Sequence, residues 1–314
     1  MGRYLLRRLL GFLPVLLGIT LISFAITELA PGDPVLLYMD RASNPTREDI
    51  EAKRHELGLD KPMPVRYVQW VGRAVTGDLG RSFVDRRPVS VKIKEMIPYS
   101  LTLAALSILV GYSLAVLVGV TAATREGTAL DWLLSTMSAM LVSAPSFWIA
   151  LMAILLFAVK WGLLPTSGWG EGSLWTTAHH LILPVAILSM GPVAGLSRFV
   201  RSGLLEVLRH DYVRTARAKG LADQIVLYKH ALRNALIPVV TIIGLSLPGL
   251  ISGAVLTENV FALPGMGRLA VGAVGARDYP TIMGVTLVLS VLTVFGNLLA
   301  DLAYGLVDPR IRYN

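Results

Sequence analysis

Six long stretches of this chain carry no charged residue, and they constrain its fold more than any other feature. They cover residues 9–27, 96–124, 132–159, 172–197, 234–257 and 279–300. Each is close to the roughly 20 residues that a helix needs to cross a hydrocarbon core about 30 Å thick. Core helices of soluble proteins carry charge on their outer face every turn or two. The stretches therefore predict an all-α membrane protein with six transmembrane helices.

The charges that remain are distributed unevenly, and this distribution predicts the topology. The formal net charge is +8, which by itself is also typical of nucleic-acid-binding proteins. However, basic residues precede the first stretch, crowd the segment 198–233 and close the chain, whereas the short loops 160–180 and 258–280 hold three in all. Since Lys and Arg are enriched in cytoplasmic loops, we expect both termini in the cytoplasm. The expected partner is then a lipid bilayer and not a nucleic acid.

The stretches divide the chain into three regions. Residues 1–30 comprise a cytoplasmic N-terminus and the first transmembrane helix, and residues 31–97 form an extracytoplasmic insertion with charges of both signs. Residues 98–314 hold the other five helices and a cytoplasmic loop at about 208–233. The first stretch resembles the apolar part of a signal peptide, but residues 27–30 (Thr-Glu-Leu-Ala) are a poor cleavage site. We interpret it as a retained span.

Two helices are expected within the insertion. Thr46 and Asp49 have the spacing of a capping box, which predicts a helix that runs to about Leu57 and stops at Gly58. A second, amphipathic helix is predicted at 64–75, with valines 68, 71 and 75 on its apolar face and Gly77 after its end. We expect both helices to pack on the outer surface of the membrane domain.

The basic segment between the fourth and fifth stretches has the start and stop signals of a short helix. Asp211 is predicted to cap the first turn, and Gly220 to supply the left-handed residue that ends the helix. Between them lie the small residues Thr215, Ala216 and Ala218, which allow another surface to approach the backbone closely. This predicts a contact surface on the cytoplasmic side and not a catalytic site.

The sequence lacks the motifs of ion-coupled carriers, of P-loop ATPases and of enzymes. The six stretches lack the midplane acids and bases on which ion-coupled carriers depend, and no Gly-Lys pair of a phosphate-binding loop occurs. The histidines at 55, 179 and 180 lack the spacing of metal ligands, and Ser143–Ser146 lacks the glycines of a nucleophile elbow. A proline kink at Pro145, in a helix that lines a pathway, is the interpretation we favour. If the chain takes part in pumping, another polypeptide must supply the energy.

The segment 211–238 resembles the conserved cytoplasmic loop of binding-protein-dependent ABC importer permeases, in the form found in dipeptide, oligopeptide and nickel systems. Anchored on Gly220, its opening triplet is Arg214-Thr215-Ala216, and His230 and Leu232-Arg233 close it. Further matches to that branch follow in order along the chain at 30–34, 57–62, 77–82, 257–261, 264–267 and 308–312. The Gly-Asp-Leu-Gly sequence at 77–80 resembles the first of the two permease subunits, the one like the dipeptide permease B subunit.

This resemblance implies a type I ABC importer permease fold with an extracytoplasmic insertion after the first helix, in a prokaryotic plasma (inner) membrane. It implies four kinds of component: this chain, a second homologous permease, two ABC ATPase subunits and an extracytoplasmic substrate-binding protein. The ATPases would use ATP and Mg, and this chain is expected to bind no cofactor or metal and to be no enzyme. The implied cargo is dipeptides or short oligopeptides, with nickel chelates or oligosaccharides as alternatives. A self-sufficient carrier or channel, or a scaffold without a transport role, remains a different class.

Three groups of site residues are predicted. The coupling helix and its end should contact an ATPase through the residues Asp211, Tyr212, Arg214, Thr215, Ala216, Arg217, Ala218, Lys219, Gly220 and Leu221. Ala216 and Ala218 are expected to face a groove of the ATPase. Weakly polar side chains are expected to line the pathway, because a peptide backbone varies little from cargo to cargo: Ser143, Ser146, Ser246, Ser252 and Asn297. Three arginines of the insertion are expected to dock the binding protein: Arg81, Arg86 and Arg87.

Overall fold

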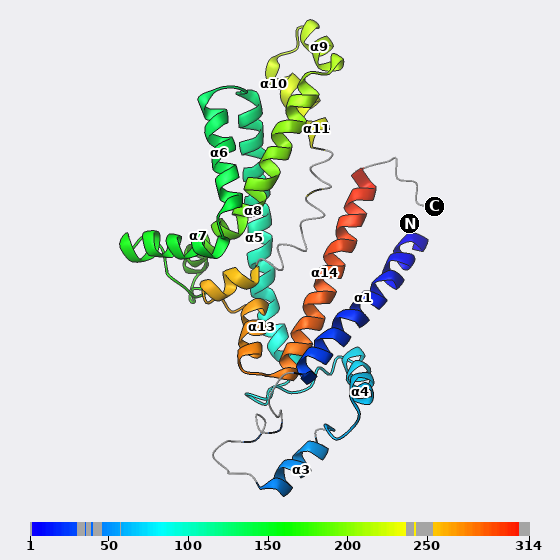
Figure 1. The fold of residues 1–314 in the computed structure, drawn as a ribbon. Helices are drawn as coiled ribbons and strands as arrows, with labels where there is room; N and C mark the ends of the chain where they lie inside the picture. Colours follow the sequence, from blue (N-terminus) through cyan, green and yellow to red (C-terminus); the bar gives the residue numbers. More distant parts are fainter. Residues whose placement is uncertain are drawn as a thin grey trace. The chain divides into compact units, whose positions relative to one another are not determined.

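The computed structural model describes residues 2–29, 35, 39, 46–56, 58–236, 242 and 254–307, with side chains placed for all of these except 2–7, 9 and 299–307. Within these ranges the regular structure is helical, apart from an isolated bridge between Arg81 and Pro88 (Figure 1). The chain divides into two compact units. The first comprises Met1–Ser100 and Pro264–Val294, and the second Leu101–Leu263 and Phe295–Asn314.

Four of the predicted spans are confirmed as single long helices. They are α1 (Gly2–Leu29), α5 (Val89–Thr124), α8 (Leu174–Leu208) and α14 (Tyr279–Val307). Each contains a stretch long and apolar enough to cross a membrane. Most of the predicted fifth span, 235–257, lies outside the described residues; α11 (Leu232–Ala235) precedes it and residues 254–260 are helical. The all-α fold class follows directly.

The predicted third span is broken. It consists of α6 (Ala129–Ser143) followed by α7 (Ser146–Ala153), which continues as the π-helix η2 (Ile154–Lys160). The two halves meet at 105°, so the expected kink at Pro145 is confirmed. Proline has no N–H and disfavours a helical conformation in the preceding residue. Accordingly Ala144 is extended (φ −89°, ψ 137°), and α7 starts anew after Pro145.

The capping box in the insertion is confirmed. The helix α3 spans Arg47–Glu56. The Thr46 amide donates to Asp49 Oδ2 (2.9 Å), and the Asp49 amide donates to Thr46 Oγ1 (3.2 Å). The hydrogen bonds from the Thr46 side chain and amide hold the pKa of Asp49 below its usual value. Gly58 follows the helix with φ +68°, as a left-handed stop requires. The packing of α3 on the membrane domain stays a prediction.

The second helix of the insertion, α4 (Met63–Val75), packs on α1, but of the predicted valine face only Val71 takes part in this contact. Val68 and Val75 are exposed, whereas Trp70 is buried with Phe24 and Met283. Tyr67 lies on the same side, and its hydroxyl is 2.9 Å from Thr20 Oγ1 of α1. Aromatic side chains bury more apolar surface than valines do, and this difference decides which face of α4 turns inward. Gly77, with φ +85°, ends this segment as predicted.

In the second unit, α5 and α8 pack closely along a seam of small residues. An added Cβ at Gly119 would lie 2.6 Å from both the Ser197 carbonyl oxygen and the Val200 Cβ, so the helices could not approach as they do with a larger residue there. Nearer the other end of the seam, Ser189 Oγ donates to the Ser107 carbonyl oxygen (3.1 Å). Small residues that let backbones approach are a common basis for helix association in membranes.

Candidate functional site

The predicted coupling helix exists as α9 (Asp211–Ala218), directly after α8. Its N-cap residue is His210, with extended backbone angles (φ −71°, ψ 148°) and no side-chain cap, so the prediction that Asp211 caps the helix is wrong. Asp211 is instead the first helical residue. The positive end of the helix dipole stabilises its exposed carboxylate. The carboxylate Oδ1 lies 3.8 Å from Arg214 Nη1.

The end of α9 is as predicted. Gly220 has φ +76°, a left-handed conformation that costs glycine little because it has no Cβ. Its amide donates to the Arg217 carbonyl oxygen (2.9 Å), and the Leu221 amide donates to the Ala216 carbonyl oxygen (3.4 Å). The last turn of the helix is therefore closed by its own backbone.

One face of α9 is buried against its own chain. Val213 and Ala216, three residues apart and therefore on one side of the helix, pack on Val226 of the π-helix η3 (Val226–Ala231), with Leu208 at the edge of the cluster. Ala216 is only 9% exposed. The expectation that its side chain faces a partner's groove is therefore wrong: Ala216 is small because η3 lies against it. Among the small residues of α9, Ala218 and Thr215 are exposed.

The outward face of α9 is basic. The exposed residues of the predicted coupling set are Asp211, Tyr212, Arg214, Thr215, Arg217, Ala218, Lys219, Gly220 and Leu221. Arg217 lies 3.3 Å from Asp223, and both side chains are exposed. Exposed ion pairs of this kind contribute about 0–1 kcal/mol, so these cations are free to exchange their partners for acidic groups of another protein. The Tyr212 hydroxyl accepts a hydrogen bond from Asn234 Nδ2 (3.0 Å), which ties this face to α11.

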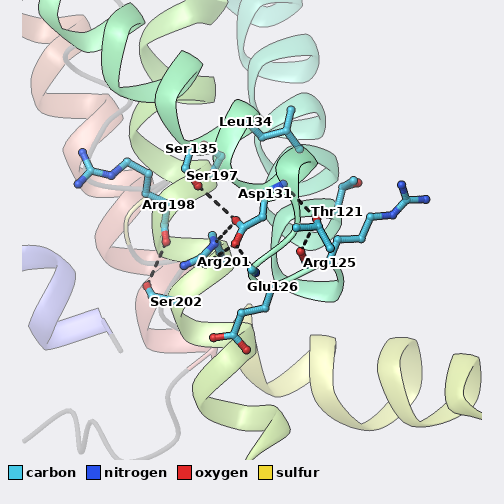
Figure 2. Close-up of polar contacts among 12 residues, drawn as sticks. Thr121, Arg125, Glu126, Asp131, Leu134, Ser135, Ser197, Arg198, Arg201 and Ser202 are labelled. Atoms are coloured by element: carbon cyan, nitrogen blue, oxygen red, sulfur yellow. Dashed lines mark hydrogen bonds and ion pairs between the residues drawn. The ribbon is translucent and has the colours of Figure 1, made fainter.

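An ion pair with a buried carboxylate and a partly exposed guanidinium joins α6 to α8 (Figure 2). The Arg201 guanidinium of α8 donates twice to Asp131 of α6, with Nε 2.7 Å from Oδ1 and Nη2 2.8 Å from Oδ2. Asp131 is 4% exposed and also accepts from the Gly127 amide (3.0 Å) and the Ser135 hydroxyl (3.3 Å). The Thr128 hydroxyl accepts from the Asp131 amide (3.4 Å), as an N-cap does. The carboxylate thus joins the α5–α6 turn, the start of α6 and α8.

This pair was not predicted from the sequence. A signal was present, because Thr128 and Asp131 have capping-box spacing directly after a glycine. That spacing predicts the start of a helix, but it gives no indication of an arginine from another helix. The signal would therefore have located Asp131 and not Arg201.

The pathway candidates are only partly described. Ser143 and Ser146 are exposed and lie on the two sides of the α6–α7 bend, where the Ser143 hydroxyl donates to the Ala139 carbonyl oxygen (3.0 Å). Asn297 is a half-buried residue of α14. Ser246 and Ser252 lie outside the described residues. The assignment of these side chains to a pathway stays a prediction.

The predicted docking arginines lie on a well-anchored loop of the first unit. Arg81, Arg86 and Arg87 are all exposed. Beside them, the buried Asp278 accepts from the Ser82 hydroxyl (2.5 Å) and the Phe83 amide (2.9 Å), which fixes the loop just before α14. Arg81 Nη1 donates to the Arg86 carbonyl oxygen (3.2 Å), and Arg87 forms an ion pair with Glu95. Hydrogen bonds to Asp278 thus anchor the loop that carries the arginines.

Comparisons with known proteins identify the family. Residues 115–313 match the family described as binding-protein-dependent transport system inner membrane component, and residues 1–104 match the corresponding N-terminal region. The chain belongs to this family. It is therefore a membrane permease subunit of an ABC transport system, and it is non-catalytic in itself.

Relatives match along the whole permease. It is 43% identical to the oligopeptide transport system permease protein AppB of Bacillus subtilis, with 100% of each chain covered. It is 39% identical to the di/tripeptide transport system permease protein DppB of Pseudomonas aeruginosa, over 99% of this chain and 98% of that one. The sequence resemblance to peptide permeases is thereby confirmed.

Solved structures confirm the type I permease fold. An inward-facing structure of the MetNI methionine ABC transporter aligns with a TM-score of 0.56 at 21% identity, over 69% of this chain and 96% of that one. An amino acid ABC transporter crystallised with histidines aligns with a TM-score of 0.51 at 14% identity, over 68% of this chain and 94% of that one. At these identities the likeness concerns the fold alone.

Proposed function

We propose that this permease forms half of the pathway through which an ATP-driven importer moves dipeptides or short oligopeptides across a prokaryotic plasma membrane. The peptide cargo is supported by the names of relatives that match the full chain, AppB and DppB. The coupling role is supported by the exposed basic face of α9, where the polar side-chain contacts with the rest of the chain that the structure describes are the exposed Arg217–Asp223 ion pair and the hydrogen bond from Asn234 to Tyr212.

The proposed complex contains a second homologous permease, two ABC ATPase subunits and an extracytoplasmic binding protein. The ATPases hold the ATP and Mg. Both termini and α9 lie on the cytoplasmic side, in keeping with the crowding of basic residues at 198–233. The loop with the three arginines lies on the opposite side, where the binding protein delivers its cargo.

Reconstitution tests this proposal. The complex in proteoliposomes should take up labelled di- or tripeptides only when ATP and the binding protein are both present, and mass spectrometry of the loaded binding protein should find peptides. A nickel chelate or an oligosaccharide in the binding protein would contradict the peptide assignment and leave the coupling role intact. ATP-independent uptake by this chain alone would contradict both and favour a self-sufficient carrier.

Binding-protein docking gives a separate prediction. Reversing Arg81 and Arg86 together to Glu should weaken docking roughly tenfold, since each exposed charge pair is worth up to about 1 kcal/mol. Arg87 is left unchanged because its ion pair with Glu95 is intramolecular. Surface plasmon resonance on the complex in nanodiscs measures the affinity. Reversal of the exposed Arg125, on the α5–α6 turn, is the matched control. If the variant with Arg81 and Arg86 reversed binds as tightly as the Arg125 control, the arginines do not dock the binding protein.

A further inference from the structure

Two side-chain contacts join α6 to α8 in the second unit. One is the ion pair between Asp131 and Arg201. The other lies between the hydroxyl groups of Ser138 and Ser197, whose Oγ atoms are 3.3 Å apart and whose residues are 4% and 3% exposed. The contacts are separated by about two turns along α6 and about one turn along α8. Two contacts at different positions along one pair of helices oppose sliding and rotation of the helices past each other.

The locked helices lead directly to α9. Only Arg209 and His210 separate the end of α8 from the first residue of α9, and Leu208 packs on the cluster that buries Val213 and Ala216. Figure 1 shows the α5–α6 turn at the same end of this unit as α9. A force on the outward face of α9 therefore acts on α8 through a short, packed connection.

At its other end, α6 reaches the 105° bend of the third span. Ser143 is the last residue of α6, and Ser146 is the first of α7. Because α6 is locked to α8, any displacement of α8 relative to the rest of the permease carries Ser143 with it. The helix thus connects the base of α9 to a break in the middle of a membrane span.

We infer that Asp131 and Arg201 are positioning residues of the transport cycle: their ion pair locks α6 to α8, so that a displacement of α9 moves the α6–α7 bend. This inference rests on the proposed function. A buried carboxylate needs complete hydrogen bonding to offset the loss of hydration. Asp131 has it, through Arg201, Gly127 and Ser135. The bidentate geometry also fixes one orientation of the two helices, which a contact between apolar side chains does not.

A nearby exposed ion pair provides a control. Arg209 is the residue after α8, and its Nη2 lies 3.3 Å from Glu126 Oε1 of the α5–α6 turn. The two side chains are 74% and 50% exposed. This contact joins the end of α8 to the turn that precedes α6, but solvent screens it. Asp131 is almost fully buried, so we expect the coupling to depend on its ion pair and not on this exposed one.

The test removes the ion pair and asks whether a disulfide elsewhere between α6 and α8 can take over its role. The chain has no cysteine, so Ser138→Cys with Ser197→Cys places one pair of thiols between α6 and α8. In the reconstituted complex, Asp131→Asn should retain ATP hydrolysis but lower the uptake per ATP about tenfold. In a chain that also carries Asp131→Asn, oxidation of the two cysteines should restore the uptake per ATP. Reduction of the disulfide should lower it again. Glu126→Gln should leave the ratio unchanged.

Three outcomes would overturn the inference: an unchanged ratio in Asp131→Asn, no restoration by the disulfide, or an equal loss in Glu126→Gln. Should Asp131→Asn fail to insert, Arg201→Lys keeps both charges, loses the bidentate contact and is expected to lower the ratio in the same way. A second readout does not depend on the cargo. Thiol labelling of Ser143→Cys should respond to ATP in the complex with the ion pair intact and not in Asp131→Asn, even if the cargo is no peptide.

Discussion

A permease with Ala218→Trp will fold, insert and bind its binding protein, but it will not support ATP-driven uptake. The side chain of Ala218 is exposed on the outward face of α9, so we expect an indole there to extend into solvent in the isolated permease. It would instead hold the ATPase several ångströms from the helix. Overpacking at a close contact costs about 1–3 kcal/mol, which corresponds to a loss of bound ATPase between about fivefold and about a hundredfold. Pull-down of the ATPases and uptake in proteoliposomes measure the two effects.

Ala216→Trp is the matched comparison, and it separates a partner contact from an internal one. Ala216 packs on Val213 and Val226 within the chain. A tryptophan there should displace α9 from η3 and lower the thermal stability of the permease itself. If Ala218→Trp destabilises the isolated permease as much as Ala216→Trp does, or if it leaves uptake normal, the outward face of α9 is not a partner surface.

A permease with Gly119→Ala will lose much of its stability. The added Cβ would lie 2.6 Å from backbone and side-chain atoms of α8, a distance at which the two helices must separate. Because α5 and α8 are both long and continuous, a local adjustment cannot absorb the shift. We expect a cost of about 1–3 kcal/mol, seen as a lower Tm in detergent. The larger Gly119→Val should prevent accumulation in the membrane.

Gly195→Ala is the control for this substitution. Gly195 also lies inside a long helix, α8, but an added Cβ there has nothing within 4 Å. Alanine in a helix interior is favoured over glycine by about 0.5–1 kcal/mol, so Gly195→Ala should leave the Tm unchanged or raise it. A Tm that falls equally in both variants would show that the α5–α8 seam is not closely packed.

Features encoded by local chemistry could be predicted from the sequence. The absence of charge located α1, α5, α8 and α14, because a membrane span tolerates almost none. Helix ends were equally accessible: Thr46 opens α3, and Gly220 has the positive φ expected after α9. In each case the signal lies within a few residues of the structure that it specifies.

Features that depend on contacts with distant segments could not be predicted. Ala216 is as small as Ala218, and only the position of η3 shows which of the two is buried. The Asp131–Arg201 pair joins residues 70 positions apart in sequence. Pro145 indicated a kink, but the 105° angle also depends on how α7 packs against the core of its unit, in which Ala150 is buried.

Site-directed crosslinking at α9 tests most directly whether its outward face couples the permease to an ATPase. The chain has no cysteine of its own, so Ala218→Cys and Ala216→Cys each introduce a single thiol into it. In the assembled complex with ATPases that carry cysteines along the contact surface, oxidation should link position 218 to an ATPase in at least one nucleotide state and should leave position 216 unlinked. If position 218 never crosslinks in any nucleotide state while position 216 does, the opposite face of α9 meets the ATPase, and coupling does not run through the exposed basic face.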